Sequence, residues 1–238
     1  MKNIFKIVSG VFALGFAAST GNAATTYVGN GSTAWGGGVG NGNIVVNDTA
    51  SGVLTFQINA SIGDNALVIY IDSVSGGFSD NSLLSDAGDP LRMAISGWNG
   101  SGRSGLNLPF AADYAIGADS GYAGIWQLAS GGNNSLVWKA GVGALPASGS
   151  IFTMNVADLG LTANSGQSFN FAAMMVSKDG WSSPEVIGGS ITGTNGRGGT
   201  QTITSGSTYT LVPEPSSTAL MGLGFAALLV VRRIRKSA

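Results

Sequence analysis

Two stretches decide the fold: Val53-Leu-Thr-Phe-Gln-Ile58 and Ala66-Leu-Val-Ile-Tyr-Ile71. The first alternates apolar and polar residues, and a period of two places Leu54, Phe56 and Ile58 on one face of a strand. The second is an unbroken apolar run of strand length, which is typical of a strand buried on both faces. Together they predict packed β-sheets.

Similar short runs recur along the body of the chain, each bounded by Gly, Asn, Asp or Ser, which favour turns. No segment of the body keeps a 3.6-residue apolar period for three turns, although residues 156–160 fit one short turn of helix. The pattern predicts an all-β fold, a single jelly-roll-like β-sandwich. The further predicted strands are 92–96, 114–117, 124–128, 136–139, 151–156, 169–176 and 207–211.

The composition of the body, residues 24–211, excludes several classes of function. It holds five cations against eleven acidic residues, a net charge of −6, so it is a poor partner for nucleic acid. The chain has no cysteine, and its stability must therefore come from core burial. It also has no histidine, which excludes most zinc sites and every catalytic device built on imidazole.

Three elements follow the body: a Pro-Glu-Pro segment, an apolar run and a basic end. Prolines fix φ and lack an N–H donor, so the first segment is expected to be extended and accessible. The apolar run, about residues 216–231, predicts a transmembrane helix whose flanks complete the span. The basic end places the C-terminus in the cytoplasm. The residues concerned are Val212, Pro213, Glu214 and Pro215, then Arg232, Arg233, Arg235 and Lys236.

This order of elements over residues 212–238 resembles the PEP-CTERM tail, which exosortase systems use to sort proteins to the surface of Gram-negative bacteria. The resemblance implies an exosortase-type processing enzyme as a partner. It also implies an inner-membrane intermediate held by the C-terminal helix, followed by delivery to the cell surface or the extracellular space. The alternatives are a plain tail anchor, which needs no Pro-Glu-Pro, and a core helix, which rarely has every face apolar.

The N-terminus agrees with export. Lys2 and Lys6 form a basic region, residues 7–18 are apolar, and Gly21-Asn22-Ala23 is a small-x-small cleavage site. Residues 1–23 therefore predict a signal peptide that is cut after Ala23, which leaves residues 24–211 as the ectodomain. A permanent N-terminal anchor is the alternative, but the apolar region is too short for a span.

Four short pieces of the body share an order and spacing with a known type of domain. They are Leu67-Val-Ile-Tyr-Ile-Asp72, Asp113-Tyr-Ala-Ile-Gly-Ala-Asp119, Gly124-Ile-Trp-Gln-Leu128, and Ala157-Asp-Leu-Gly-Leu161 before Phe169-Asn-Phe171. Over about residues 64–189 they resemble DOMON-like sandwich domains, which are related to some secreted carbohydrate-binding modules. The resemblance implies a ligand-binding or structural role and supplies no catalytic residues.

Motifs for nucleotide binding and nucleophilic catalysis are weak. Gly100-Ser-Gly-Arg-Ser-Gly105 fits the GxGxxG pattern, but that fingerprint needs a following helix, and residues 106–110 include a proline and have no amphipathic period, so the motif predicts a flexible loop. Serine nucleophiles have no histidine base. A Ser–Lys pair that uses Lys139 or Lys178 has no supporting motif.

Carboxylates are the remaining catalytic option, since a pair of acids hydrolyses glycosides without histidine. Acidic residues beside Gly, Asn or Ser usually form turns, however, and most acids of the body have such neighbours. We therefore predict a protein that is not an enzyme, with a glycoside-acting enzyme as the third-ranked reading. The candidates for that reading are Asp113, Asp119, Asp158, Asp179 and Glu185.

One segment gathers hard oxygen ligands: Asp80, Asn81, Asp86 and Asp89. Oxygen donors on a loop suit Ca²⁺, although the spacing is not that of an EF-hand and ordinary turn chemistry is the alternative. No other cofactor is predicted.

All five tryptophans fall in the body. Trp126 and Trp138 lie inside apolar runs, which predicts that both are packed. Trp98 and Trp181 lie in loops rich in Gly, Asn, Asp and Ser, where a large aromatic side chain is harder to bury, so they are the candidate binding surface. Two functions follow: a noncatalytic surface protein associated with extracellular polymer, or a module that binds polysaccharide through loop aromatics.

Overall fold

The computed structural model describes residues 24–213 and residue 232. Residues 24–213 all fall within one compact unit. The predicted signal peptide with its cleavage site at Ala23, the predicted transmembrane helix, and all the tail residues named above except Val212, Pro213 and Arg232 lie outside the described residues. Within the described part, no helix is long and apolar enough to cross a membrane.

The first sheet has four antiparallel strands in the order β1-β2-β3-β10. Leu54, Phe56 and Ile58 on β3 are all fully buried on one face, as their period of two predicts. That face packs against the central sheet. The strands are β1 Thr25–Val28, β2 Asn43–Asp48, β3 Val53–Asn59 and β10 Ser150–Asn155.

The central sheet has the strand order β12-β11-β4-β7-β8-β9, and β15 also pairs with β11. Alternate residues of β4 enter two different cores, Leu67 and Ile69 on one face and Val68 and Tyr70 on the other. This double burial explains why residues 66–71 read as a continuous apolar run. The strands are β4 Ala66–Asp72, β7 Tyr114–Ala118, β8 Ala123–Gln127, β9 Val137–Gly143, β11 Ser168–Val176, β12 Ser182–Ile187 and β15 Ser207–Thr210.

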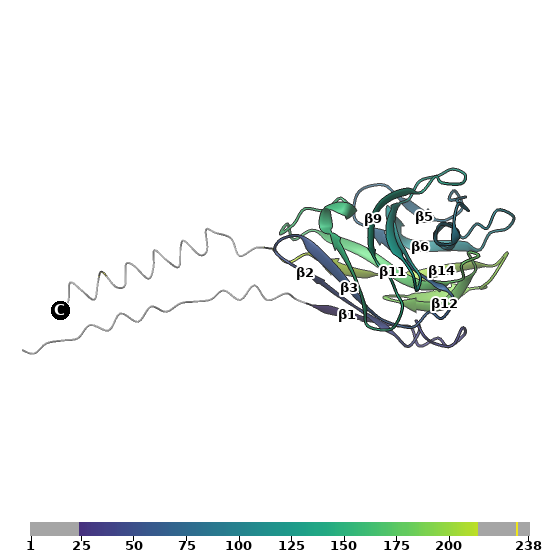
Figure 1. Cartoon of the computed structure of the whole chain (residues 1–238), viewed down its shortest axis with the longest axis horizontal. Helices are drawn as coiled ribbons and strands as arrows, with labels where there is room; N and C mark the ends of the chain where they lie inside the picture. The colour runs from purple at the N-terminus through teal and green to yellow at the C-terminus, as the bar shows by residue number, and fades with distance from the viewer. Residues whose placement is uncertain (1–23, 214–231, 233–238) are drawn as a thin grey trace, which may run out of the picture. The chain divides into compact units, whose positions relative to one another are not determined.

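A third sheet and a helix cover the other face of the central sheet. The third sheet has the order β13-β14-β6-β5, with β14 and β6 parallel. Leu91 and Ile95 of the helix and Leu106 and Ile203 of the sheet enter the second core. In Figure 1, β2 and β3 lie on one side of β11, and β5 and β6 on the other. The elements are β5 Phe78–Asp80, α1 Pro90–Ser96, β6 Gly105–Ala112, β13 Ser190–Gly193 and β14 Thr200–Ser205.

The predicted all-β sandwich is confirmed, and so is the helical turn, which is the 3₁₀ helix η1 Val156–Leu159. The predicted strand at 92–96 is wrong, because this segment belongs to α1. The Asp89 side chain caps the helix by accepting from the N–H groups of Leu91 and Arg92, each at 3.0 Å, and Gly97 ends it at φ 65°. A helix this short cannot display an apolar period.

The loop predicted at residues 100–105 is confirmed up to Ser104, but the segment after it, residues 106–110, is the middle of β6, a strand that was not predicted. Pro109 cannot donate to a strand ladder. The pairing of β6 with β14 ends at Asn107, so Pro109 interrupts no hydrogen bond between these two strands.

Candidate functional site

Trp98 and Trp181 belong to loops that touch. Trp98 follows α1, and Trp181 lies in the turn between β11 and β12. The residues before them are in contact, since a Cβ atom added to Gly180 would lie 3.1 Å from the carbonyl carbon of Gly97. The fold therefore brings the two predicted ligand residues to one loop cluster.

Each indole of this cluster has an arginine over its ring. The guanidinium carbon of Arg103 lies 5.5 Å from the ring centroid of Trp98, and that of Arg197 lies 5.9 Å from the ring of Trp181, both within cation–π range. Arg103 also donates to the carbonyl oxygens of Asn81 and Ser96. Trp98 is half-buried and Trp181 is 41% exposed, so Trp181 offers the larger accessible surface.

The other two tryptophans of interest differ from one another. Trp126 is 3% exposed, which confirms its predicted packing. The same prediction for Trp138 is wrong, because its side chain is 54% exposed on the edge strand β9. Its Nε1–H donates to the hydroxyl of Tyr122 at 2.8 Å, and Tyr122 is itself 40% exposed. Trp138, which the sequence predicted to be packed, therefore forms an exposed aromatic pair with Tyr122.

Asp86, the central residue of the predicted calcium loop, has a full set of protein partners. Its side chain is fully buried and its Oδ1 accepts from the N–H groups of Gly88 and Asn134. Its Oδ2 accepts from the Leu136 N–H at 3.0 Å and pairs with the Arg92 guanidinium at 2.7 Å. Asp86 therefore ties the loop before β9 to α1.

The other predicted calcium ligands also serve local structure. Asp80 accepts from the Ser82 N–H, and Asp89 caps α1 and pairs with Arg92. The side-chain oxygen of the buried Asn81 accepts from the Leu106 N–H. Over residues 24–213, no group of three or more His, Cys, Asp or Glu side chains is placed to hold a metal ion.

Addition of Ca²⁺ is therefore expected to leave the thermal midpoint of residues 24–213 unchanged relative to excess chelator. The oxygens of Asp86 already accept from four donors, and a bound ion would have to displace them. Differential scanning fluorimetry measures the midpoint. A midpoint that rises with Ca²⁺ concentration, as linkage requires for a bound ion, would support the calcium site.

The candidate catalytic carboxylates also hold structure together. Asp113 accepts from the N–H groups of Ser73 and Val74, and Asp158 accepts from that of Asn155. Asp179 is exposed.

Asp119, a further carboxylate of this set, accepts from the N–H groups of Gly121 and Tyr122. It also pairs with Lys178 at 3.1 Å. Lys178 is thereby engaged as an ion-pair partner, while Lys139 is an exposed residue of β9.

The lowered pKa values of three acids argue against general acid catalysis by them. Burial raises the pKa of Asp86, Asp119 and Glu185, but hydrogen bonds from N–H donors outweigh it, and each pKa lies below its ordinary value. A general acid that works near neutral pH needs a raised pKa. These three carboxylates are therefore ionised at neutral pH.

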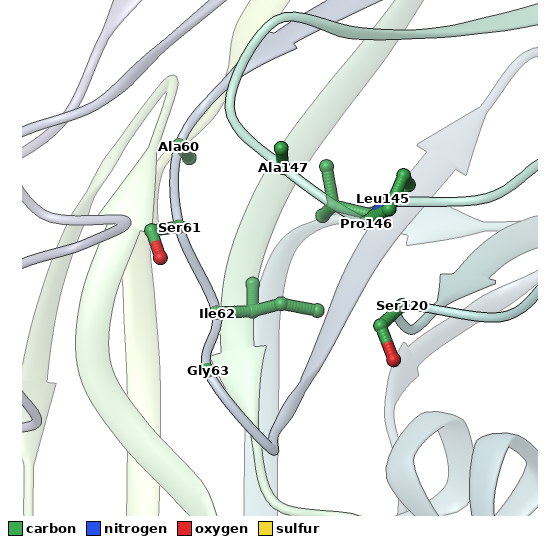
Figure 2. Close-up of a pocket in the computed structure, with 8 residues that line it drawn as sticks. All are labelled: Ala60, Ser61, Ile62, Gly63, Ser120, Leu145, Pro146 and Ala147. Carbon is green, nitrogen blue, oxygen red and sulfur yellow. The ribbon is translucent and has the colours of Figure 1, made fainter.

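The described surface of the sandwich includes two hollows of different size. The smaller, of about 110 Å³, is below the ~300 Å³ at which small-molecule pockets begin. Figure 2 shows Ile62 reaching into it, with Pro146 above and Ser120 across from it. The larger, of about 480 Å³, is an open groove along residues 26–30, 188–190 and 205–207. Neither lining contains an acidic or basic side chain, so neither presents a charged catalytic group.

The sandwich ends directly before the Pro-Glu-Pro segment. Leu211 is fully buried, and Asp48 accepts from the hydroxyl of Tyr209 at 2.6 Å and from the N–H of Val212 at 3.2 Å. The next residue, Pro213, is exposed. The last hydrogen bonds of the described sandwich therefore leave the start of this segment accessible.

Comparison with known proteins agrees with this boundary. Residues 211–236 match the family model described as the PEP-CTERM protein-sorting motif. Searches of curated proteins and of solved structures find no match, and the resemblance of the body to DOMON-like domains stays a prediction. The chain thus carries a PEP-CTERM protein-sorting motif, the signal by which exosortase-type enzymes process exported proteins for the cell surface.

Proposed function

We propose that this chain is a noncatalytic surface protein whose β-sandwich attaches to extracellular polysaccharide after export. The observation that carries the proposal is the pair of touching loops that hold Trp98 and Trp181, with 41% of Trp181 exposed. Aromatic side chains offer a flat apolar face with a polar edge, and exposed apolar patches mark interaction sites. A sugar ring, with its C–H faces and hydroxyl rim, matches that surface.

The charge of the body favours a neutral polymer. Residues 24–211 carry a net charge of −6, so an acidic polysaccharide meets repulsion. Arg103 and Arg197 lie over the indoles of the cluster and add hydrogen-bond donors at its rim. A neutral, hydroxyl-rich polymer avoids the repulsion and can accept hydrogen bonds from these arginines.

The carboxylates support a noncatalytic role. Asp86, Asp113 and Glu185 are buried and accept from backbone N–H groups, so they hold loops in place. A glycoside-acting enzyme needs two carboxylates that face a sugar, one of them with a raised pKa. The structural roles of these acids therefore favour binding of a polysaccharide over its hydrolysis.

The test is a pull-down of purified residues 24–213 with microcrystalline cellulose, granular starch and an insoluble β-1,3-glucan. We expect retention on at least one neutral polymer, weakened about tenfold by Trp181→Ala, since truncating a contributing interface residue costs more than about 1 kcal/mol and about 1.4 kcal/mol is tenfold. Val28→Ala, which alters a side chain that is 70% exposed on β1, is the control and should bind as the parent does.

Two results would overturn this function. Failure to bind any of these polymers would remove polysaccharide attachment. Release of reducing sugar from a bound polymer would show hydrolysis and favour the enzyme reading.

A further inference from the structure

The face of the central sheet that carries α1 is left open at its β8–β9 edge. Over β7 this face is closely covered, since a Cβ atom added to Gly117 would lie 3.1 Å from Ile95 and 3.4 Å from Leu91. The strand β9 is the last of the sheet, and its Trp138 lies opposite Trp126 of β8. The exposed indole therefore lies beside a buried one on the same face.

Irregular pairing puts Trp138 on that face. Trp126 pairs with Trp138, while its neighbour Ile125 pairs with Ala140, so Lys139 is an extra residue, a β-bulge. Beyond the bulge, Gly124 pairs with Gly141. Trp138 and Gly141, three positions apart, therefore both face the side of Trp126 and Gly124.

The Tyr122 ring lies over Gly124 and Gly141, whose lack of a side chain leaves room for it. A Cβ atom added to Gly124 would lie 2.9 Å from the Tyr122 ring, and one added to Gly141 would lie 3.4 Å from its hydroxyl. The ring also meets Trp126 edge to face, with centroids 6.3 Å apart. The two glycines therefore let the phenol lie against the strands.

Hydrogen bonds hold the pair at both ends. Asp119 accepts from the backbone N–H of Tyr122 at 2.9 Å, and Lys178 pairs with that carboxylate. The Tyr122 hydroxyl accepts from Trp138 Nε1–H, and its own hydrogen remains free to donate to a ligand. The two rings are thus oriented before any ligand arrives, which lowers the entropic cost of binding.

Packing among residues 24–213 does not account for the pair, because 40% of Tyr122 and 54% of Trp138 remain exposed. The edge strand β9 carries an exposed lysine and a bulge at Lys139, which protect an edge against unwanted pairing, yet the adjacent Trp138 and Val137 remain 54% and 50% exposed. An oriented aromatic pair with a free hydroxyl donor suits the C–H face of a pyranose ring with a hydroxyl acceptor beside it.

We propose that Tyr122 and Trp138 form a second stacking platform for a neutral polysaccharide, separate from the Trp98 and Trp181 loops. The platform rests on the proposed function, attachment to polysaccharide, and names a further site for it. We expect the bound polymer to be a neutral pyranose chain for two reasons. The acidic body repels acidic polymers, and the charge of the Asp119 carboxylate next to the pair is already neutralised by Lys178.

The experiment compares variants of residues 24–213 on the same three polymers. Trp138→Ala is expected to weaken binding about tenfold. Tyr122→Phe, which keeps the ring and loses the hydroxyl, is expected to weaken it about threefold. Val137→Ala, an equally exposed position on the same strand, is the matched control and should bind as the parent does. Equal melting temperatures establish that the variants are folded.

The outcomes separate the two proposals. Loss of binding in Trp138→Ala with Val137→Ala unchanged supports the platform, whatever Trp181→Ala does. Parent-like binding by Trp138→Ala together with loss in Trp181→Ala overturns the platform and leaves the proposed function standing. No binding by the parent overturns both. A parent dimer in sedimentation that Trp138→Ala converts to monomer would overturn the platform in favour of an interface between copies.

Discussion

Replacing Glu185 by alanine is expected to lower the free energy of unfolding by about 3–5 kcal/mol, because each buried N–H donor left without an acceptor costs about 1–3 kcal/mol. Glu185 is fully buried. Its Oε1 accepts from the N–H groups of Trp35 and Gly37 at 2.7 and 2.9 Å, and its Oε2 from those of Val39 and Gly40 at 3.0 and 3.2 Å. Alanine leaves these donors without an acceptor. Urea unfolding of residues 24–213 measures the loss.

The pH dependence of stability gives a second readout for this residue. Burial raises the pKa of Glu185, but the four N–H donors outweigh it, so its folded pKa lies below its unfolded one. Such a group stabilises fully above the unfolded pKa, and its contribution is lost as pH falls through the folded pKa. Stability of Glu185→Gln should therefore fall less steeply than that of the parent below about pH 5.

Asp64→Asn supplies the control for both readouts, because Asp64 is exposed in a turn. It should keep the parent's stability and its acid profile. If Glu185→Ala and Asp64→Asn were equally stable, the role assigned to the four N–H bonds would be wrong.

Replacing Pro213, Glu214 and Pro215 by alanine is expected to abolish delivery to the surface and leave full-length protein in the inner membrane. Among the described residues the sandwich makes its last hydrogen bonds at Leu211 and Val212, and Pro213 is exposed, which suits access by a processing enzyme. The prolines keep such a segment extended. Cell fractionation with an antibody against the sandwich follows both the location and the length of the chain.

A triple alanine variant on the sandwich itself controls for nonspecific effects. Thr192, Thr194 and Asn195 are exposed around the turn between β13 and β14, and their replacement should leave processing intact. Normal surface delivery of the Pro-Glu-Pro variant would show that these residues do not direct sorting.

Local sequence patterns predicted much of the sandwich. The alternation in residues 53–58 and the apolar run at 66–71 report burial along one strand, which depends on near neighbours. The helix α1 was not predicted, because seven residues are too few to show a 3.6-residue apolar period. Asp89, Pro90 and Gly97 do mark its two ends. Strand β6 was not predicted either, because it contains Pro109, and proline normally disfavours a strand.

Exposure of the aromatic residues depended on tertiary structure. Trp138 lies in an apolar run, and its sequence neighbours predict burial. The bulge at Lys139 and the position of β9 at the edge of the sheet expose it. Trp98 and Trp181 were chosen from their loop composition, but only the contact between Gly97 and Gly180 shows that their two loops touch.

The sequence by itself determined the β-class of the body and the sorting motif, because strand periodicity and a linear motif are written in adjacent residues. Three features depend on tertiary structure alone: the third layer, the hydrogen bonds that the buried acids accept, and the exposure of the aromatic residues. Glu185 shows the reason: its donors lie 145 to 150 positions away along the chain. No local pattern encodes such a pairing, since it forms only when folding brings the two segments together and removes water from both.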